Sequence, residues 1–150
     1  MEIIYYEDQY AEDFKQLNLE WLYKYNLAES HDLQVVNDPR GTIINRGGCI
    51  FLAKENDTIA GTAALMKEND AVYELAKMSV DPTFRGKGIS KLLLNRCLQE
   101  ARSLGAKKLM LFSNHQLQTA LHLYRQFGFK DIPVTDSPFV TADVKMELVL

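Results

Sequence analysis

Hydrophobic and polar residues follow two different periods in the first third of the chain. A short apolar run at 3–6 suits a strand, and the stretch 10–25 repeats apolar groups at helical spacing, which predicts a helix. A second helical stretch is expected at 29–46, where Pro39 and Gly41 interrupt the pattern. The chain is therefore expected to begin with one strand and two helices.

The centre of the chain has the pattern of an antiparallel sheet. Strands are predicted at 49–54, 58–66 and 71–80, where apolar runs are bounded by turn residues. The Asn-Asp pairs at 56–57 and 69–70 are typical of tight hairpin turns. Three consecutive strands joined in this way are expected to pair antiparallel.

The second half alternates helices and strands. Apolar residues of 89–104 recur on one helix face that ends at Gly105, and a second stripe over 117–127 ends at Gly128. Further strands are predicted at 108–112, 129–132 and 142–149. The order β-α-α-β-β-β-α-β-α-β-β predicts one α/β (α+β) domain over 1–150, a mixed, mostly antiparallel sheet of about seven strands flanked by helices.

The composition indicates a globular protein. The 150 residues are 47% hydrophobic, which is enough for a core. No apolar run approaches the roughly 20 residues of a membrane span, and the first ten residues lack the basic flank of a signal peptide. A cytoplasmic protein with no membrane partner is expected.

The two cysteines indicate neither a disulfide nor a metal site. Cys49 and Cys97 lie far apart in the sequence and form no C-x-x-C pair. No histidine stands at metal-ligand spacing from either of them. Both are predicted to be small core residues.

The net charge of -3 conceals an uneven distribution. Residues 1–76 carry a net charge of -8, residues 77–130 carry +8 and residues 131–150 carry -3. The basic segment favours an anionic ligand, and the acidic first half favours a cation such as an amine. Solvated surface charge is the alternative. Nucleic acid is not expected, because the whole chain is acidic and no aromatic residues alternate with the basic ones.

Two glycines and three cations are found where the third central strand leads into the helix that follows it. In D-P-T-F-R-G-K-G-I-S-K, Gly86 and Gly88 lie beside Arg85, Lys87 and Lys91. Amides at the start of a helix are unpaired and attract anions, and glycine keeps side chains out of the way. The segment predicts a phosphate site, with a ligand-free turn as the alternative.

Two other phosphate-binding motifs do not fit this segment. The sequence has no G-x-x-x-x-G-K-[ST], which argues against a nucleotide-triphosphate P-loop. The run G-K-G-I-S-K lacks the third glycine of a dinucleotide fingerprint. The strands before it are expected to be linked by hairpins, whereas the dinucleotide fold needs parallel crossovers.

The segment 85–90 resembles the R/Q-x-x-G-x-G/A signature of the GNAT superfamily of acyl-CoA N-acyltransferases, with Ser90 where Gly or Ala is usual. Further segments resemble the strand before the signature, the end of the next strand, and the closing helix and turn: 75–80, 113–114 and 120–129. The resemblance covers 49–150. It implies the GNAT fold and transfer of an acyl group to an amine.

The resemblance also implies that acetyl-CoA is the cosubstrate and that no metal is needed. Backbone N–H groups from Arg85 to Ser90 would hold the pyrophosphate, and the strand edge at Met78 and Val80 would pair with the pantetheine arm. Asn114 would bond the arm farther along. The full implied cofactor-binding set is Met78, Ser79, Val80, Arg85, Gly86, Lys87, Gly88, Ile89, Ser90, Lys91, Asn114 and Tyr124.

Glu74 is the candidate general base. Strand alternation predicts that it shares a face with Ala76, Met78 and Val80, in apolar company that would raise its pKa toward neutrality. An amine of pKa ~10.4 must lose a proton before it attacks a thioester. A glutamate that is exposed at an edge or paired in a salt bridge is the alternative.

Tyr124 is the candidate general acid. Its L-Y-x-x-x-G-F context resembles that of the family tyrosine which protonates the departing thiolate. A phenol can donate the hydrogen bond or proton that a thiolate of pKa ~8.5 needs. A buried core tyrosine is the alternative.

The acceptor is expected to be a primary amine of a small molecule or a protein, attacking directly in a ternary complex. Its pocket is predicted between the first two helices and the central strands, near Trp21, Tyr23 and Tyr25. Three points stay open: a noncatalytic CoA-binding module, a transferase for a larger acyl group, and a homodimer through the last strands.

Overall fold

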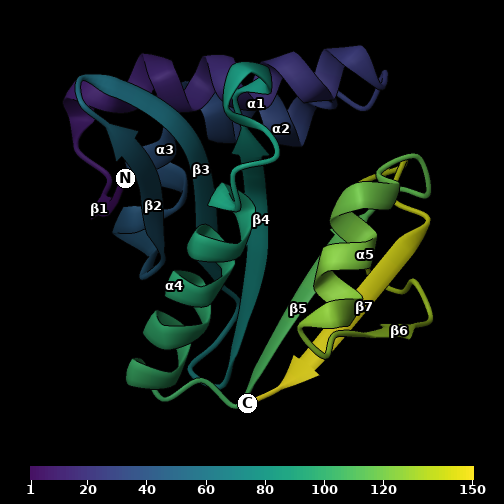
Figure 1. Ribbon diagram of the computed structural model, residues 1–150. Coiled ribbons are helices and arrows are strands. Elements are labelled where there is room, and N and C mark those ends of the chain that lie inside the picture. The colour runs from purple at the N-terminus through teal and green to yellow at the C-terminus, as the bar shows by residue number, and fades with distance from the viewer.

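Seven strands form one open, twisted sheet that carries helices on both faces. The computed structural model describes residues 1–150, and Figure 1 shows the arrangement. The strands are β1 (Glu2–Tyr5), β2 (Cys49–Glu55), β3 (Thr58–Lys67), β4 (Val72–Val80), β5 (Lys108–Ser113), β6 (Lys130–Ile132) and β7 (Val144–Val149). The helices are α1 (Ala11–Lys24), α2 (Ser30–Asn37), α3 (Pro39–Thr42), α4 (Ile89–Ser103) and α5 (Gln118–Gln126).

The strand order in the sheet is β1-β2-β3-β4-β5-β7-β6. All neighbours pair antiparallel except β4 and β5, which pair parallel. The parallel pair follows from the chain path, because α4 carries the chain from one end of β4 back to the other before β5 begins. The predicted mixed, mostly antiparallel seven-stranded sheet is confirmed.

The helical stretch expected at 29–46 divides differently from the prediction. The break falls at Asp38, whose side chain accepts a hydrogen bond from the Gly41 amide and so caps α3. Pro39 occupies the first position of α3, where a missing N–H costs nothing. Gly41 therefore continues a short helix, and the expectation that it interrupts one was wrong.

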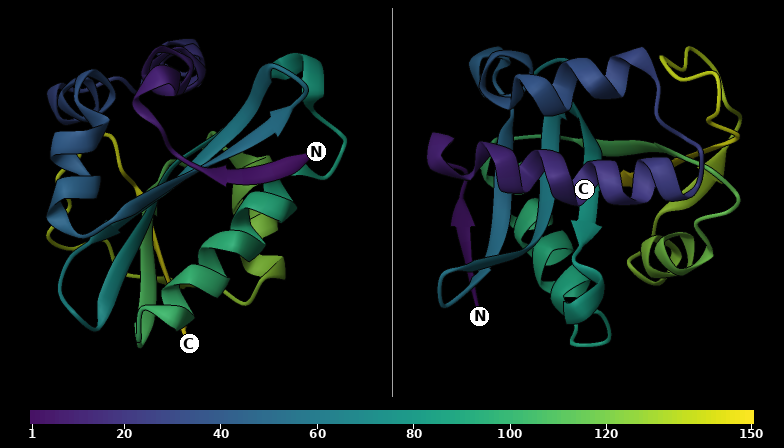
Figure 2. Two further views of the ribbon diagram at one scale, coloured as in Figure 1. Left: turned by 90° about the vertical axis from the view of Figure 1, so that its left-hand side faces the viewer. Right: turned by 90° about the horizontal axis from the view of Figure 1, so that it is seen from above.

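Two hydrophobic cores lie on opposite faces of the sheet. Helices α4 and α5 cover one face, and α1, α2 and α3 cover the other, as the edge-on view in Figure 2 shows. Leu93 of α4 and Leu65 of β3 are fully enclosed in the first core, and Phe14 of α1 is fully enclosed in the second. Cys97 is buried in the first core as predicted, and Cys49 packs against it half-buried.

A β-bulge interrupts β4. The pairing with β3 shifts register between Thr62 and Ala64, so that Lys77 and Met78 together stand opposite Ala63. Lys77 has φ 51°, in the left-handed region that side chains rarely adopt. The extra residue exchanges the faces of every side chain that follows it.

The bulge overturns one prediction from strand alternation. Glu74 does share a face with Ala76, but the next residue on that face is Ser79, whose Oγ donates to the Leu17 carbonyl of α1. Met78 and Val80 instead belong to the face covered by α4 and α5. Glu74 and Met78 therefore lie on opposite faces of the sheet.

A buried polar network holds the bulge against α1. Thr62 Oγ1 donates to the Lys77 carbonyl at 3.0 Å, and Asn18 Nδ2 donates to Thr62 Oγ1 at 3.3 Å and to the Phe14 carbonyl at 2.9 Å. Trp21 Nε1 donates to Asn18 Oδ1 at 3.1 Å. Asn18 and Thr62 are completely buried, so water cannot reach their polar groups. The hydrogen bonds within the network satisfy these groups instead.

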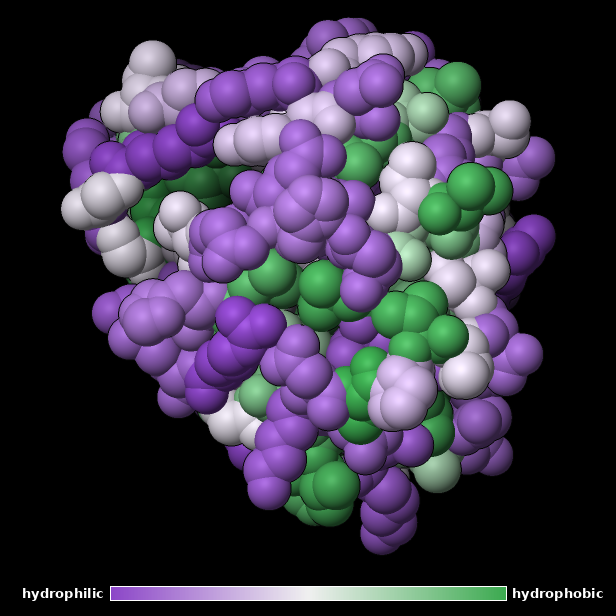
Figure 3. Space-filling model, turned by 90° about the vertical axis from the view of Figure 1, so that its right-hand side faces the viewer, coloured by the Kyte–Doolittle hydropathy of each residue, from purple (hydrophilic) through white to green (hydrophobic).

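One face of the molecule is mainly polar. In Figure 3, the side of the molecule that carries β6 and β7 is largely hydrophilic, and hydrophobic side chains are spread over it in small groups. None of the helices is both long enough and apolar enough to cross a membrane.

Replacing Thr62 with valine tests the network. We expect Thr62→Val to lower the free energy of unfolding by about 1–3 kcal/mol, because the Lys77 carbonyl and one Asn18 N–H lose their buried partner. Urea denaturation measures the change. The exposed Thr58→Val in the same strand is the control and should stay near wild type. Equal stability of the two variants would contradict the role of the network.

Candidate active site

The parallel strands β4 and β5 pair for only three residues and then separate. Their register joins 72–74 to 108–110, and beyond this point the strands diverge, as the V between them in Figure 1 shows. The space between the diverging strands is a cleft of about 580 Å³. Parts of α1, β4, β5, α5 and the turn before α4 line it, together with the loop before β7.

One wall of this cleft is a free strand edge. Residues 75–80 of β4 pair with β3 on one side and have no strand partner on the other. The same residues line the cleft. An unpaired edge offers N–H and C=O groups to an extended ligand, which can add itself as a further strand.

The glycine segment lies at one end of the cleft. Gly86 has φ 79° and Gly88 has φ 77°, and a Cβ placed on either would meet nothing within 4 Å. The six backbone N–H groups from Gly86 to Lys91 have no acceptor within the protein. They stand at the N-terminus of the 15-residue α4, so the helix dipole adds positive potential.

Two details of this segment differ from the prediction. The Arg85 amide donates to the Pro82 carbonyl at 3.4 Å, so the free amides begin at Gly86 rather than at Arg85. Lys87 lies outside the cleft lining, and its Nζ sits 5.2 Å from the centre of the Phe84 ring. The Arg85 guanidinium and Lys91 do line the cleft, although Arg85 also contacts Glu20 at 3.4 Å.

Glu74 lies in the cleft wall, and its carboxyl group is buried without a partner. The residue is 5% exposed, and its carboxylate forms neither a hydrogen bond nor a salt bridge. Burial raises its pKa to about 7, an effect that Lys77 opposes and Glu68 and Asp32 reinforce. The predicted rise of its pKa is confirmed, and the exposed and salt-bridged alternatives do not hold.

Tyr124 reaches across the cleft from α5. Its hydroxyl donates toward Met78 Sδ at 3.8 Å, and its ring packs against Phe129. Burial raises the pKa of the phenol well above its ordinary value, so the hydroxyl stays a proton donor. Tyr124 is thus both a core residue and part of the cleft wall.

Two other predicted residues have side chains that are already bonded. Ser79 Oγ is bound to α1, as described above, so only its backbone is free for a ligand. Asn114 Nδ2 donates to the Thr141 carbonyl at 2.8 Å, and its Oδ1 accepts from the Gln116 amide at 3.0 Å. Asn114 therefore fixes the loop before β7 to the turn before α5. Met78, Val80, Ile89 and Ser90 line the cleft as expected.

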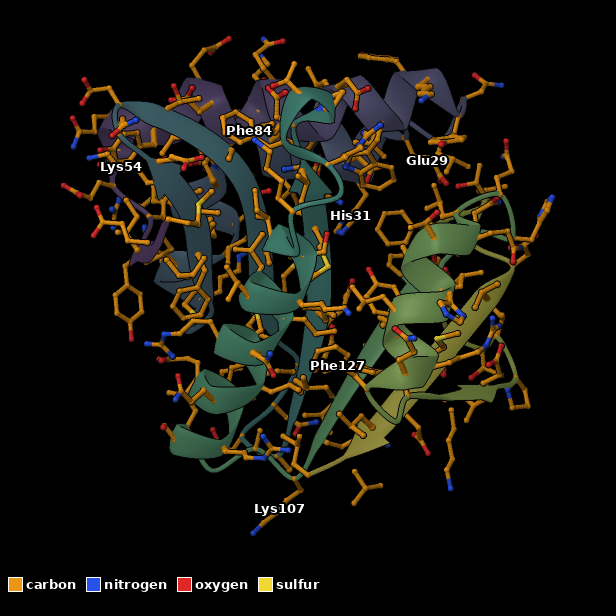
Figure 4. The ribbon with its side chains drawn as sticks, in the orientation of Figure 1. Glu29, His31, Lys54, Phe84, Lys107 and Phe127 are labelled. Carbon is orange, nitrogen blue, oxygen red and sulfur yellow. The ribbon has the colours of Figure 1, made fainter.

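Aromatic side chains also line the cleft. Trp21 and Tyr25 line it as predicted, but Tyr23 is 61% exposed and lies outside the lining, so its placement in the pocket was wrong. Sequence reasoning missed Phe139, which comes from the loop before β7. Its ring lies edge-on to that of His31 at 5.1 Å; Figure 4 shows His31 extending from α2 toward the gap between β4 and β5.

Sequence reasoning also missed a buried ion pair in the cleft wall. Lys77 Nζ lies 2.7 Å from Asp32 Oδ1 of α2, and both residues line the cleft. A lysine in a mostly apolar strand was an available signal. Asp32 gave no signal, because its partner comes from a distant part of the sequence.

Comparison with known proteins identifies the family. The model of the Acetyltransferase (GNAT) family matches residues 8–129 of this chain. The chain belongs to this family. Its GNAT fold is shared by a GNAT-family acetyltransferase of Staphylococcus aureus Mu50, whose structure superposes with a TM-score of 0.88 at 24% identity and covers 97% of this chain and 96% of its own.

Two further proteins show the range of the similarity. The PaiA N-acetyltransferase of Thermoplasma acidophilum, solved in complex with coenzyme A, has a TM-score of 0.75 at 17% identity over the full length of both chains. Human N-acetyltransferase 8B is 32% identical over 89 residues, which are 56% of this chain and 39% of that protein. The chain spans 30% to 63% of the length of the curated relatives considered, so similarity in sequence extends over only part of each.

The raised pKa of Glu74 predicts a pH dependence of stability. A carboxyl group whose pKa rises from 4.5 to about 7 on folding stabilises the protein below its unfolded pKa, and this contribution is lost as pH rises through 7. Relative to Glu74→Gln, wild type should lose about 2 kcal/mol of unfolding free energy between pH 5 and pH 8. Urea titrations at several pH values measure this, with the exposed Glu2→Gln as control. Parallel curves for wild type and Glu74→Gln would contradict it.

Proposed function

We propose that this GNAT-family chain is an N-acetyltransferase that moves the acetyl group of acetyl-CoA to a primary amine by direct attack. The observation that carries the proposal is the row of six unpaired amides from Gly86 to Lys91 at one end of a cleft that also contains Glu74 and Tyr124. Phosphate oxygens can accept from such amides without displacing any bond within the protein.

The cleft suits the remaining parts of acetyl-CoA. An extended arm can run along the free edge of β4, where 75–80 offer unpaired backbone groups. The cosubstrate supplies an activated acetyl thioester. An arm in this position would bring the thioester into the part of the cleft that Tyr124 and Glu74 also line.

Glu74 and Tyr124 have the protonation properties that the transfer needs. With a pKa of about 7, Glu74 is half ionised near neutral pH and can take a proton from an ammonium group, directly or through water. Burial keeps Tyr124 protonated, so its hydroxyl can donate a hydrogen bond to the thiolate that forms as the C–S bond breaks. Most of the acceleration comes from holding amine and thioester in line.

The free amides predict that CoA binding is sensitive to Gly88. In Gly88→Asp, the side chain at φ 77° strains the turn and puts a negative charge where phosphate binds. We expect the dissociation constant for CoA, measured by calorimetry, to rise at least about tenfold.

Gly105→Asp is the matched control for this experiment. Gly105 follows the far end of α4, has φ 80° and is equally open, so it carries the same strain and charge away from the amides. It should leave CoA affinity unchanged. If Gly88→Asp binds CoA as wild type does, the phosphate site is not at this turn.

The proposed roles predict that Tyr124→Phe lowers turnover by about 10²-fold with little change in CoA affinity, because the proton donor is lost while the ring remains. Release of thiol from acetyl-CoA across a panel of amines measures turnover. Tyr73→Phe, a buried tyrosine of β4 outside the cleft lining, is the control. Wild-type turnover in Tyr124→Phe would remove the tyrosine from the mechanism.

Tight CoA binding by wild type with no thiol release on any amine would favour a noncatalytic CoA-binding module.

A further inference from the structure

The ion pair between Asp32 and Lys77 lies in the cleft wall. The two side chains are 3% and 4% exposed, and 2.7 Å separates Oδ1 of Asp32 from Nζ of Lys77. The second oxygen of Asp32 accepts from the Glu29 amide at 3.0 Å as part of the cap of α2. Asp32 is therefore occupied on both oxygens.

The hydrogen-bond donors of Lys77, in contrast, are only partly used. Its ammonium group has three N–H donors, and Asp32 is the single acceptor that the protein supplies. The Phe139 ring covers one side, with its centre 5.3 Å from Nζ. A buried ammonium with unfilled donors is unfavourable, and this cost is offset if a ligand brings an oxygen to it.

The residues around Lys77 indicate which chemical group of a ligand could bind it. The other cations of the lining, Arg85 and Lys91, belong to the glycine segment, and Arg85 already contacts Glu20. Trp21 and Phe139 also line the cleft and offer apolar surface. Lys77 is thus the cation available to an anionic group on the acceptor.

The bulge of β4 brings Lys77 and Glu74 to the same region of the cleft. Lys77 bonds Asp32 of α2, so its side chain extends to the face that also carries Glu74. The positive charge of Lys77 lowers the pKa of the Glu74 carboxyl, against the effect of burial. A molecule that presents its amine to Glu74 therefore has its neighbouring substituents on the side of the cleft that also carries Lys77.

We propose that the acceptor is a zwitterionic amino acid, whose carboxylate binds the Lys77 ammonium while its amino group lies at Glu74. This inference rests on the proposed N-acetyltransferase function and specifies its acceptor. Asp32 holds the ammonium in place and balances its charge when no substrate is bound. Lys77 is then a specificity-determining residue.

Binding of matched ligand pairs tests the inference without requiring turnover. Each pair is an amino acid and the amine that remains after its carboxylate is removed, titrated by calorimetry into wild-type protein saturated with CoA. Pairs with aromatic, aliphatic and short side chains make up the panel. We expect each amino acid to bind at least about tenfold more tightly than its amine, because a charge-assisted bond to Lys77 is lost with the carboxylate.

Two variants locate the effect. Lys77→Met should remove the difference within each pair, and the exposed Lys130→Met of β6 should retain it. If Lys77→Met fails to fold, the affinities of the wild-type protein for each amino acid and its matched amine still test the inference. Equal affinity within the pairs, or no binding of any amino acid, overturns the inference.

Thiol release on the same panel separates this inference from the proposed function. Turnover of amino acids and simple amines with equal kcat/KM overturns the inference and leaves the N-acetyltransferase standing. Selective binding of amino acids with no thiol release supports the carboxylate site and removes the transferase.

Discussion

The site exists because two parallel strands stop pairing after three residues. Beyond Glu74 and Met110, β4 and β5 share no further register, and the sheet opens into a cleft inside the molecule. A free strand edge is normally a hazard that proteins cover. Here helices α1 and α5 flank the opening, so the edge is open to a ligand that enters the cleft and screened from other chains. Phosphate binding, acyl placement and amine access all depend on that opening.

The bulge at Lys77 distributes the chemistry over the two faces of β4. Without it, strand alternation would put Glu74 and Met78 on one face, and Met78 would not meet Tyr124. With it, Glu74 lies on the side of α1 and α2, while Met78 meets Tyr124 on the side of α5. Base and acid therefore approach the cleft from opposite sides. The strained φ of Lys77 is stabilised by Thr62 and Asn18, which explains why wholly buried polar residues sit in this part of the fold.

Periodicity and turn chemistry were sufficient for the element order, because local patterns determine where each helix and strand lies. The glycine segment could also be predicted, since the start of a helix and its glycines are sequential features. The bulge could not, because it depends on how Thr62 pairs with Ser79 across a sheet. For the same reason the sequence could not predict the Asp32–Lys77 pair, whose members are 45 residues apart. It also could not predict the position of Phe139, which lies in an irregular loop. Tyr23 was misplaced because a helix stripe gives the buried face only approximately.

Residue-resolved amide hydrogen exchange of the wild-type protein, with and without CoA, tests the central claim most directly. The account predicts that CoA slows exchange of the amides from Gly86 to Lys91 and of free-edge amides within 75–80 of β4, because the ligand supplies the acceptors that the fold lacks. Unchanged exchange at both places in the presence of saturating CoA would contradict it.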